Sequence, residues 1–371
     1  NYWCARTSLG LAVFSYKHVG KLLRDRRLRQ GSYAWPSRQN AKGSFADFWR
    51  RSIISQEGLQ HRRIRLLSVK ALDADFVRSL IPEFKKIADD LCLSLRQKNK
   101  CEFQSEFALP FAGKAICVLL NFPLSRWQEI ANDASILGLA MGLNYKLNEK
   151  KINDACDRLL NLANDLITRA KGGDFNCGLV YRLVSLSKQF PEVDKTNLVD
   201  LVVMLIFGGV DTTRSQLGFI MALFDRYPEQ WNFLSQDPSL VPNAIEEAIR
   251  AWPTTTWSTR EAMEDFVLEG VRVLKGETLH LLVHASSKDP ALGDLPEFDI
   301  RLKQPQHHGF GGGAHHCLGH FMARTDMSCA LNSLVKTFLS FKLNGCPRYL
   351  PDSGNTSPEY LPLTYTVKAL T

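Results

Sequence analysis

The segment 196–227 constrains the fold of this chain more than any other feature. It reads TNLVDLVVMLIFGGVDTTRSQLGFIMALFDRY, begins with a threonine that can cap a helix, and is followed at once by Pro228. These boundaries predict one long helix. Because its residues are apolar nearly all round, we expect the helix to run through the middle of the protein. Its longest apolar run, 201–210, is too short to cross a bilayer, so we expect no membrane anchor.

The remaining chain predicts a mainly α fold with a small β region. Helical periodicity dominates 59–251, and a further helix is expected over 318–340. Short runs bounded by glycine turns predict strands within 252–306 and 355–371, together with one strand near the N-terminus. No internal repeat or linker-like segment divides the sequence. We therefore expect a single domain over residues 1–371.

Charge and cysteine usage narrow the class of protein. The chain has a formal net charge of +8, and much of its basic charge lies in 17–30 and 49–70. No nucleic-acid motif accompanies these clusters, so a protein partner or a buried anionic ligand is favoured over nucleic acid. The nine cysteines are scattered and form no CxxC pair. This pattern is not a disulfide framework, and it fits a reduced, cytoplasmic setting.

The stretch HHGFGGGAHHCLGHFMAR at 307–324 surrounds a single cysteine with glycines and histidines, and three kinds of site compete for it. A phosphate-binding loop is rejected, because the stretch has neither GK[ST] nor a GxGxxG after a strand. A zinc site is a weak alternative: His316 and His320 flank Cys317, yet structural zinc usually takes four ligands in paired short spacings. The third possibility is a Cys317 thiolate bound to the iron of a porphyrin.

Several features of the stretch favour the thiolate interpretation. Cys317 stands just before a helix N-terminus, whose free N–H groups and dipole stabilise negative charge. Glycines let the backbone lie flat against a planar ligand where a side chain would collide with it. Phe310 can pack over the sulfur, and His315 can reach a carboxylate on the rim of the cofactor.

The residues Phe310, Gly313, Cys317 and Gly319 match the signature F-x-x-G-x-x-x-C-x-G, on which the chain resembles the cytochrome P450 family. The resemblance covers nearly the whole chain and is best to the soluble, bacterial-type members. It implies the P450 fold, with haem b between the long central helix and the cysteine loop. It also implies that Cys317 is the axial ligand, that the other signature residues surround the cofactor, and that O2 is a co-substrate.

The sequence GGVDTT at 208–213 resembles the oxygen-activation motif of the family. The resemblance implies that Gly208 and Gly209 leave room for O2 and weaken the local helix. It implies further that the Thr212 hydroxyl holds the distal oxygen and a water, while Asp211 relays protons. Taken alone, a threonine in the middle of a helix more often bonds to a backbone carbonyl of its own helix.

The resemblance implies four partners for the two haem carboxylates, which need positive charge when they are buried. The motif HRRIR matches H-x-x-x-R and supplies His61 and Arg65. The motif TREAMED matches R-x-A-x-x-D and supplies Arg260. His315 completes the set.

A structural lock behind the cysteine loop is implied as well. The motif EAIR matches E-x-x-R, in which Glu247 and Arg250 pair across one helical turn. The family adds an arginine shortly after an F-D pair. Here Arg301 stands one residue earlier than expected, and Leu302 takes the usual place. We therefore expect either a shifted register at Arg301 or an altered lock.

By resemblance the chain is a haem-thiolate monooxygenase that inserts one oxygen atom into an apolar small molecule, with hydroxylation as the default outcome. Electrons are expected from an external ferredoxin and its NAD(P)H-dependent reductase, docking near Arg62, Arg63 and His320. The rival interpretations are a haem-binding sensor or carrier without turnover, and the zinc protein. The expected substrate pocket combines aromatic rings with hydroxyl groups, from Trp35, Phe48, Thr254, Thr255 and Trp257.

Overall fold

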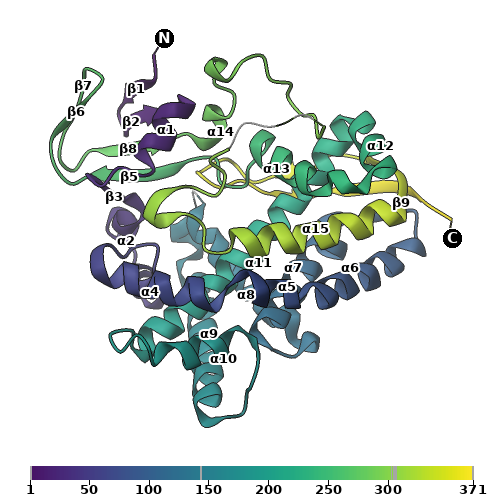
Figure 1. The fold of residues 1–371 in the computed structure, drawn as a ribbon, viewed down its shortest axis with the longest axis horizontal. Helices are drawn as coiled ribbons and strands as arrows, with labels where there is room; N and C mark the ends of the chain where they lie inside the picture. The colour runs from purple at the N-terminus through teal and green to yellow at the C-terminus, as the bar shows by residue number, and fades with distance from the viewer. Residues whose placement is uncertain (1, 143, 302, 304–306, 370–371) are drawn as a thin grey trace.

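Helix α11 (Lys195–Arg226) crosses the middle of the molecule, as predicted (Figure 1). The expected threonine cap is wrong, because the helix begins one residue earlier. The Asp194 carboxylate accepts the Asn197 N–H at 2.8 Å, and the Asn197 side chain accepts the Asp194 N–H at 3.2 Å. This reciprocal pair satisfies two N–H groups that the helix leaves free. The computed structural model describes residues 2–142, 144–301, 303 and 307–369.

The two halves of α11 pack into different hydrophobic clusters. One cluster joins its N-terminal half to α7 (Leu109–Leu120), α8 (Trp127–Gly138) and α9 (Tyr145–Gly172). A second cluster joins its C-terminal half to α6 (Ile81–Arg96), α13 (Val241–Ala251) and α15 (His320–Thr337). By length and composition alone α11 could cross a membrane, and half of its most apolar window is buried inside the protein.

The other elements surround this centre. The remaining helices are α1 (Tyr16–Leu22), α2 (Trp35–Arg38), α3 (Ser44–Arg51), α4 (Gly58–Ala71), α5 (Ala74–Ser79), α10 (Gly178–Ser187), α12 (Pro228–Gln236) and α14 (Val283–Ser286). The strands are β1 (Cys4–Thr7), β2 (Gly10–Val13), β3 (Leu28–Gln30), β4 (Lys100–Glu102), β5 (Ser258–Ala262), β6 (Phe266–Leu268), β7 (Val271–Val273), β8 (Thr278–Leu281), β9 (Phe338–Leu343), β10 (Arg348–Tyr349), β11 (Pro358–Tyr360) and β12 (Pro362–Val367).

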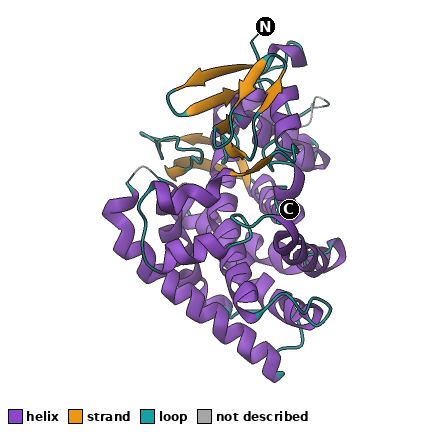
Figure 2. Cartoon of the chain, turned by 90° about the vertical axis from the view of Figure 1, so that its left-hand side faces the viewer, coloured by secondary structure: helices purple, strands orange, loops and turns teal. Residues whose placement is uncertain are grey.

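The β region lies beside the helical body, mostly above it in Figure 2. Its largest sheet has the order β1-β2-β8-β5-β3, in which only β2 and β8 pair in parallel. A second sheet has the order β4-β12-β9, and the pairs β10-β11 and β6-β7 stand apart from both. Strand β5 is central to the site, because it carries Arg260 between its neighbours β3 and β8.

The strands expected around a glycine turn in 266–283 are confirmed as β6, β7 and β8. The turn between β6 and β7 places Glu269 and Gly270 at positive φ, 48° and 80°. Two consecutive residues of this kind fit the right-handed twist of a tight hairpin. The mainly α fold with a small β region is therefore as expected.

Candidate active site

The cysteine loop is closed by its own backbone. The Cys317 N–H donates to the Phe310 carbonyl at 2.9 Å, and the Gly311 N–H donates to the His308 carbonyl at 2.8 Å. Gly313 has a φ of 68°, and a Cβ at this position would lie 2.5 Å from the Leu23 carbonyl oxygen. Only glycine fits there, since both the backbone conformation and the close approach of another chain segment exclude a side chain.

Cys317 lies just before the N-terminus of α15. Burial raises the pKa of this thiol, while a hydrogen bond from the Gly319 N–H and the charges of Arg65 and Arg324 act in the opposite direction. These three groups would stabilise a thiolate once a cation binds the sulfur. Residues 2–142, 144–301, 303 and 307–369 contain no group of three or more His, Cys, Asp or Glu side chains that could hold a metal ion. The zinc alternative therefore lacks a ligand set, whereas iron in a porphyrin needs only the one sulfur from this side.

Two guanidinium groups near the loop have no carboxylate partner within the described residues. Arg260 is only 4% exposed, and it donates to the Gln30 side chain, to Ser258 Oγ and to the Thr259 carbonyl. Burial lowers the pKa of Arg260 to about 10. Arg65 is half-buried and forms no ion pair in the described chain. Buried cations need anions nearby, so these two arginines fit the two carboxylates of haem.

The two histidines of the expected set lie together. The rings of His61 and His315 are 4.3 Å apart. His61 is buried and its Nε2 has no hydrogen-bond partner in the described residues. Burial, the neighbouring His315 and the Arg65 charge lower the pKa of His61 to about 4, although Glu57 opposes them. Because this buried imidazole nitrogen near Arg65 has no partner in the described residues, it can donate a hydrogen bond to a carboxylate ligand.

Sequence reasoning missed Glu57, which already occupies part of this cluster. Its Oε1 accepts the Gln30 N–H at 2.7 Å and lies 3.0 Å from His315 Nε2. Burial raises the pKa of Glu57, but the bonds from His315 and Gln30 outweigh that effect and lower it. His315 thus has a carboxylate partner from the protein itself. Nothing in the sequence indicated this, because strand β3, helix α4 and the loop meet only in the fold.

The middle of α11 presents the GGVDTT motif without a break in the helix. A Cβ at Gly209 would lie 2.5 Å from Ile116 Cδ1 of α7, whereas a Cβ at Gly208 would meet nothing within 4 Å. The open space therefore lies at Gly208, whereas a side chain at Gly209 would have to displace the end of the Ile116 side chain. The expected weakening of the helix is not seen, because α11 runs without interruption from residue 195 to residue 226.

The polar residues of the motif have partners in this structure. Thr212 is exposed, and its Oγ1 donates to the Gly208 carbonyl one turn earlier. This is the helix back-bonding common for threonine. The Asp211 carboxylate accepts a hydrogen bond from Arg214 at 2.8 Å. Arg214 is a residue that the motif does not include, and its spacing of three was the only available signal.

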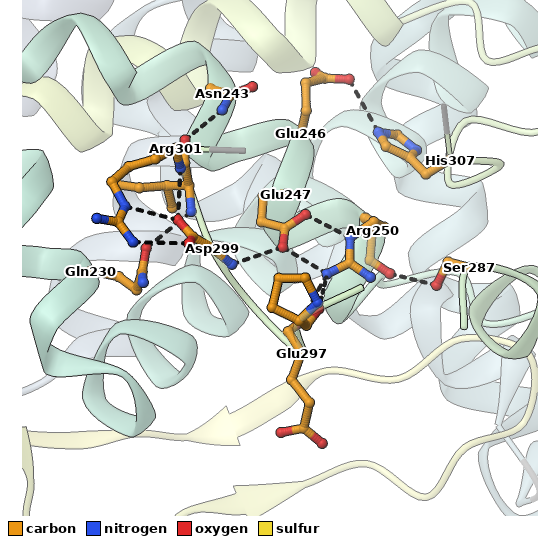
Figure 3. Close-up of polar contacts among 12 residues, drawn as sticks. Gln230, Asn243, Glu246, Glu247, Arg250, Ser287, Glu297, Asp299, Arg301 and His307 are labelled. Carbon is orange, nitrogen blue, oxygen red and sulfur yellow. Dashed lines mark hydrogen bonds and ion pairs between the residues drawn. The ribbon is translucent and has the colours of Figure 1, made fainter. Parts of the chain in front are cut away.

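Glu247 and Arg250 are in contact, and of the two alternatives for Arg301 the altered lock is the one that the structure shows (Figure 3). Arg250 makes two bonds of 2.6 Å to Glu247, with both side chains below 5% exposure. The Asp299 N–H, not Arg301, donates to Glu247 at 2.9 Å. Arg301 pairs with Asp299 at 3.0 Å, and its guanidinium carbon lies 3.9 Å from the centre of the Phe233 ring. Leu302 lies outside the described residues.

The residues expected to line the substrate pocket are mostly buried or already bound to other residues of the chain. Phe48 is fully buried, so it cannot touch a substrate in this conformation. Trp35 packs edge-on against Tyr145, with ring centres 4.8 Å apart. Thr254 is buried with its hydroxyl on Gln216, and the Thr255 hydroxyl bonds to Asn355 at 3.0 Å. Trp257 remains partly accessible and lies beside Gly354. Aromatic residues at the start of the chain were a poor signal, since they serve equally well as core.

The expected docking residues are mixed in character. Arg62 is exposed, whereas Arg63 pairs with Glu192 at 2.9 Å. His320 is half-buried, with its Nδ1 3.0 Å from Arg324 Nη1. Of the three, only Arg62 therefore presents an exposed charge that forms no ion pair within the described chain.

Comparisons with known proteins agree with this geometry. The family model described as "Cytochrome P450" matches residues 234–353. Luteothin monooxygenase from Streptomyces thioluteus is 29% identical over 98% of this chain and 90% of its own length. The biotin biosynthesis cytochrome P450 of Bacillus subtilis is 25% identical over 96% of this chain and 90% of its own length.

Solved structures share the fold. CalO2 superposes with a TM-score of 0.90 at 23% identity, over 98% of this chain and 93% of its own. P450BioI, solved with an acyl carrier protein that bears a fatty acid, also gives 0.90 at 24% identity, over 98% of this chain and 96% of its own. P450 enzymes use haem b on a cysteine thiolate, with O2 as co-substrate. The family match over residues 234–353, the named monooxygenase relatives and the shared fold show that this chain is similar, along nearly its whole length, to bacterial-type cytochrome P450 monooxygenases.

Proposed function

We propose that Cys317 is the axial ligand of the haem and that the enzyme hydroxylates an apolar small molecule. The observation that carries the assignment is the setting of Cys317: a single thiol in a loop shaped by Gly313, near the charge of Arg65, which forms no ion pair in the described chain. The buried Arg260, which also forms no ion pair there, supplies a second cation. A sulfur ligand and two cations are what a porphyrin with two carboxylates requires. His61 and His315 support Arg65 and Arg260 in this role.

When bound, the haem supplies O2 activation, and the protein supplies the ligand, the charges and the protons. Burial raises the pKa of the Cys317 thiol, and the Gly319 N–H with the charges of Arg65 and Arg324 opposes that effect, so these groups would stabilise the thiolate once the sulfur binds iron. The Thr212 hydroxyl donates to the Gly208 carbonyl, and its oxygen can still accept a hydrogen bond. Asp211 would bring protons to this hydroxyl through its second carboxylate oxygen, since Arg214 binds the first.

Electron supply and location complete the proposal. An acidic ferredoxin, reduced by an NAD(P)H-dependent reductase, would dock through Arg62 and neighbouring basic residues, so turnover should fall as ionic strength rises. All nine cysteines are free in the structure. Free thiols are consistent with a reduced cytoplasm.

The experiment that tests turnover uses the Thr212→Ala variant. The wild-type enzyme, supplied with ferredoxin, reductase and a substrate found by a spin-state screen, should form oxygenated product in step with NAD(P)H consumption. Thr212→Ala should keep haem and substrate binding yet divert electrons to peroxide. Unchanged coupling in this variant would contradict the role given to Thr212.

The second function, a haem sensor or carrier, would bind ligands without consuming NAD(P)H. A wild-type protein that binds the haem and the substrates of the screen but forms no oxygenated product with several reductase systems would favour this alternative.

A further inference from the structure

A carboxylate of α13 connects two elements that flank Cys317. Glu246 Oε1 accepts a hydrogen bond from Arg324 Nε at 2.6 Å, and Oε2 accepts one from Arg324 Nη2 at 2.9 Å. Oε2 also lies 3.1 Å from His307 Nε2 (Figure 3). Arg324 belongs to α15, and His307 begins the cysteine loop. The Glu246 side chain of α13 therefore contacts residues on both sides of Cys317 in the sequence: His307 before it and Arg324 after it.

The side chain of His307 is buried, and both of its ring nitrogens are engaged in hydrogen bonds. Its side chain is 6% exposed, and its Nδ1 accepts the Gly309 N–H at 3.1 Å. A ring nitrogen that accepts from the backbone leaves the proton on the other nitrogen, so Nε2 donates to Glu246. The backbone at Gly309 and the carboxylate on α13 are thus joined through a single imidazole.

Arg324 connects Glu246 to the surroundings of the Cys317 sulfur. Its guanidinium carbon lies 4.3 Å from the centre of the Phe310 ring. Phe310 in turn accepts the Cys317 N–H through its carbonyl. The Arg324 charge also counteracts the effect of burial on the pKa of the Cys317 thiol. If Arg324 moves, both the cover over Phe310 and the positive charge near the sulfur move with it.

Glu246 is charged under all ordinary conditions. Burial raises the pKa of its carboxyl, but the bonds from His307 and Arg324 outweigh that effect and lower the pKa to about 2. The two parallel bonds from one guanidinium are the strong, directional form of an ion pair. By contrast, Arg301, the expected third member of the lock, pairs with Asp299 and is 49% exposed.

We propose that Glu246 is a positioning residue that holds the cysteine loop in its ligating shape through Arg324 and His307, alongside the Glu247–Arg250 pair. The inference rests on the proposed role of Cys317 as the axial ligand. It predicts that Glu246 and Arg324 act as one unit, so the loss of either side chain should have the same effect on the iron–sulfur bond.

The test follows the thiolate band of the reduced, CO-bound holoenzyme over time at several pH values. In the wild type the red-shifted Soret band should persist. Glu246→Gln and Arg324→Gln should each lose it about tenfold faster, the change expected for a partly exposed bidentate pair. The double variant should decay no faster than either single variant. Arg324→Lys should also decay faster, because a lysine cannot make two parallel bonds.

Controls separate this inference from the proposed function. Glu229→Gln removes an exposed carboxylate of the neighbouring helix α12 and should decay like the wild type. If the wild type never shows the band, the ligand assignment fails before this inference is tested. The inference is overturned if Glu246→Gln keeps wild-type decay, or if the two single effects add in the double variant. Should Glu246→Gln fail to take up haem, Arg324→Lys still decides: wild-type decay in that variant overturns the proposal.

Discussion

Arg214 Nη2 lies 2.8 Å from Asp211 Oδ1, one helical turn along α11 from the residue it binds. Both side chains are less than a quarter exposed. The other carboxylate oxygen of Asp211 faces Gly138 at the end of α8, where an added Cβ would come within 3.2 Å. The Asp211 carboxylate therefore lies between the Arg214 guanidinium of its own helix α11 and the Gly138 backbone of α8.

We expect Arg214→Gln to loosen this carboxylate and to lower the yield of product per NAD(P)H by about three- to tenfold, without loss of haem. The measurement is product and peroxide formed per NAD(P)H consumed. Arg226→Gln, at the exposed end of the same helix, serves as the matched control and should leave the yield unchanged. In an Asp211→Asn background the Arg214 substitution should have no further effect; an undiminished effect there would separate Arg214 from Asp211.

Two glycines of the cysteine signature should differ in their tolerance of alanine. Gly313 has a φ of 68° and lies against the Leu23 backbone, whereas Gly319 has a φ of −86° and nothing within 4 Å of an added Cβ. Gly313→Ala should lower the free energy of unfolding by about 2 kcal/mol or more. Gly319→Ala should change it by about 0.5 kcal/mol at most. Urea unfolding of both variants checks this, and equal losses would contradict the loop geometry.

The buried pair of α13 should matter far more than Arg301. Glu247→Gln leaves the buried Arg250 guanidinium without its anion, so we expect a loss of about 3–5 kcal/mol in the free energy of unfolding. Arg301→Ala removes an exposed side chain and should be indistinguishable from the wild type. Thermal and urea unfolding measure both. A large effect at Arg301 would restore it to the lock.

His61 should make stability depend on pH in the haem-free chain. Its pKa in the fold is about 4, against 6.5 ordinarily, so between these values the unfolded chain binds more protons than the folded one. Stability from this residue is present above pH 6.5 and is lost as the pH falls toward 4, by about 1–3 kcal/mol. The neighbours Glu57, Arg65 and His315 contribute to this shift. Unfolding of wild type and His61→Gln over this range should converge at low pH; parallel curves would contradict the assignment.

Local patterns predicted the parts of the site that are continuous in sequence. The position of Cys317 before a helix, the glycines around it and the long central helix followed from spacing and composition alone. Glu57 and Glu246 did not, because each acts through a residue more than sixty positions away. The altered lock at Arg301 could be stated only as one of two alternatives, because the motif does not show that Asp299 and the Phe233 ring bind this side chain. Phe48 was misread because an aromatic residue in the core and one in a pocket have the same sequence signature.

The most direct test of the account is the spectrum of the reduced, CO-bound protein together with its iron content. The wild type should hold one haem per chain and show the red-shifted Soret band of thiolate ligation, and Cys317→Ser should abolish that band while the fold persists. A wild-type protein without the band, or a Cys317→Ser variant that keeps it, would contradict the assignment of this sulfur as the ligand.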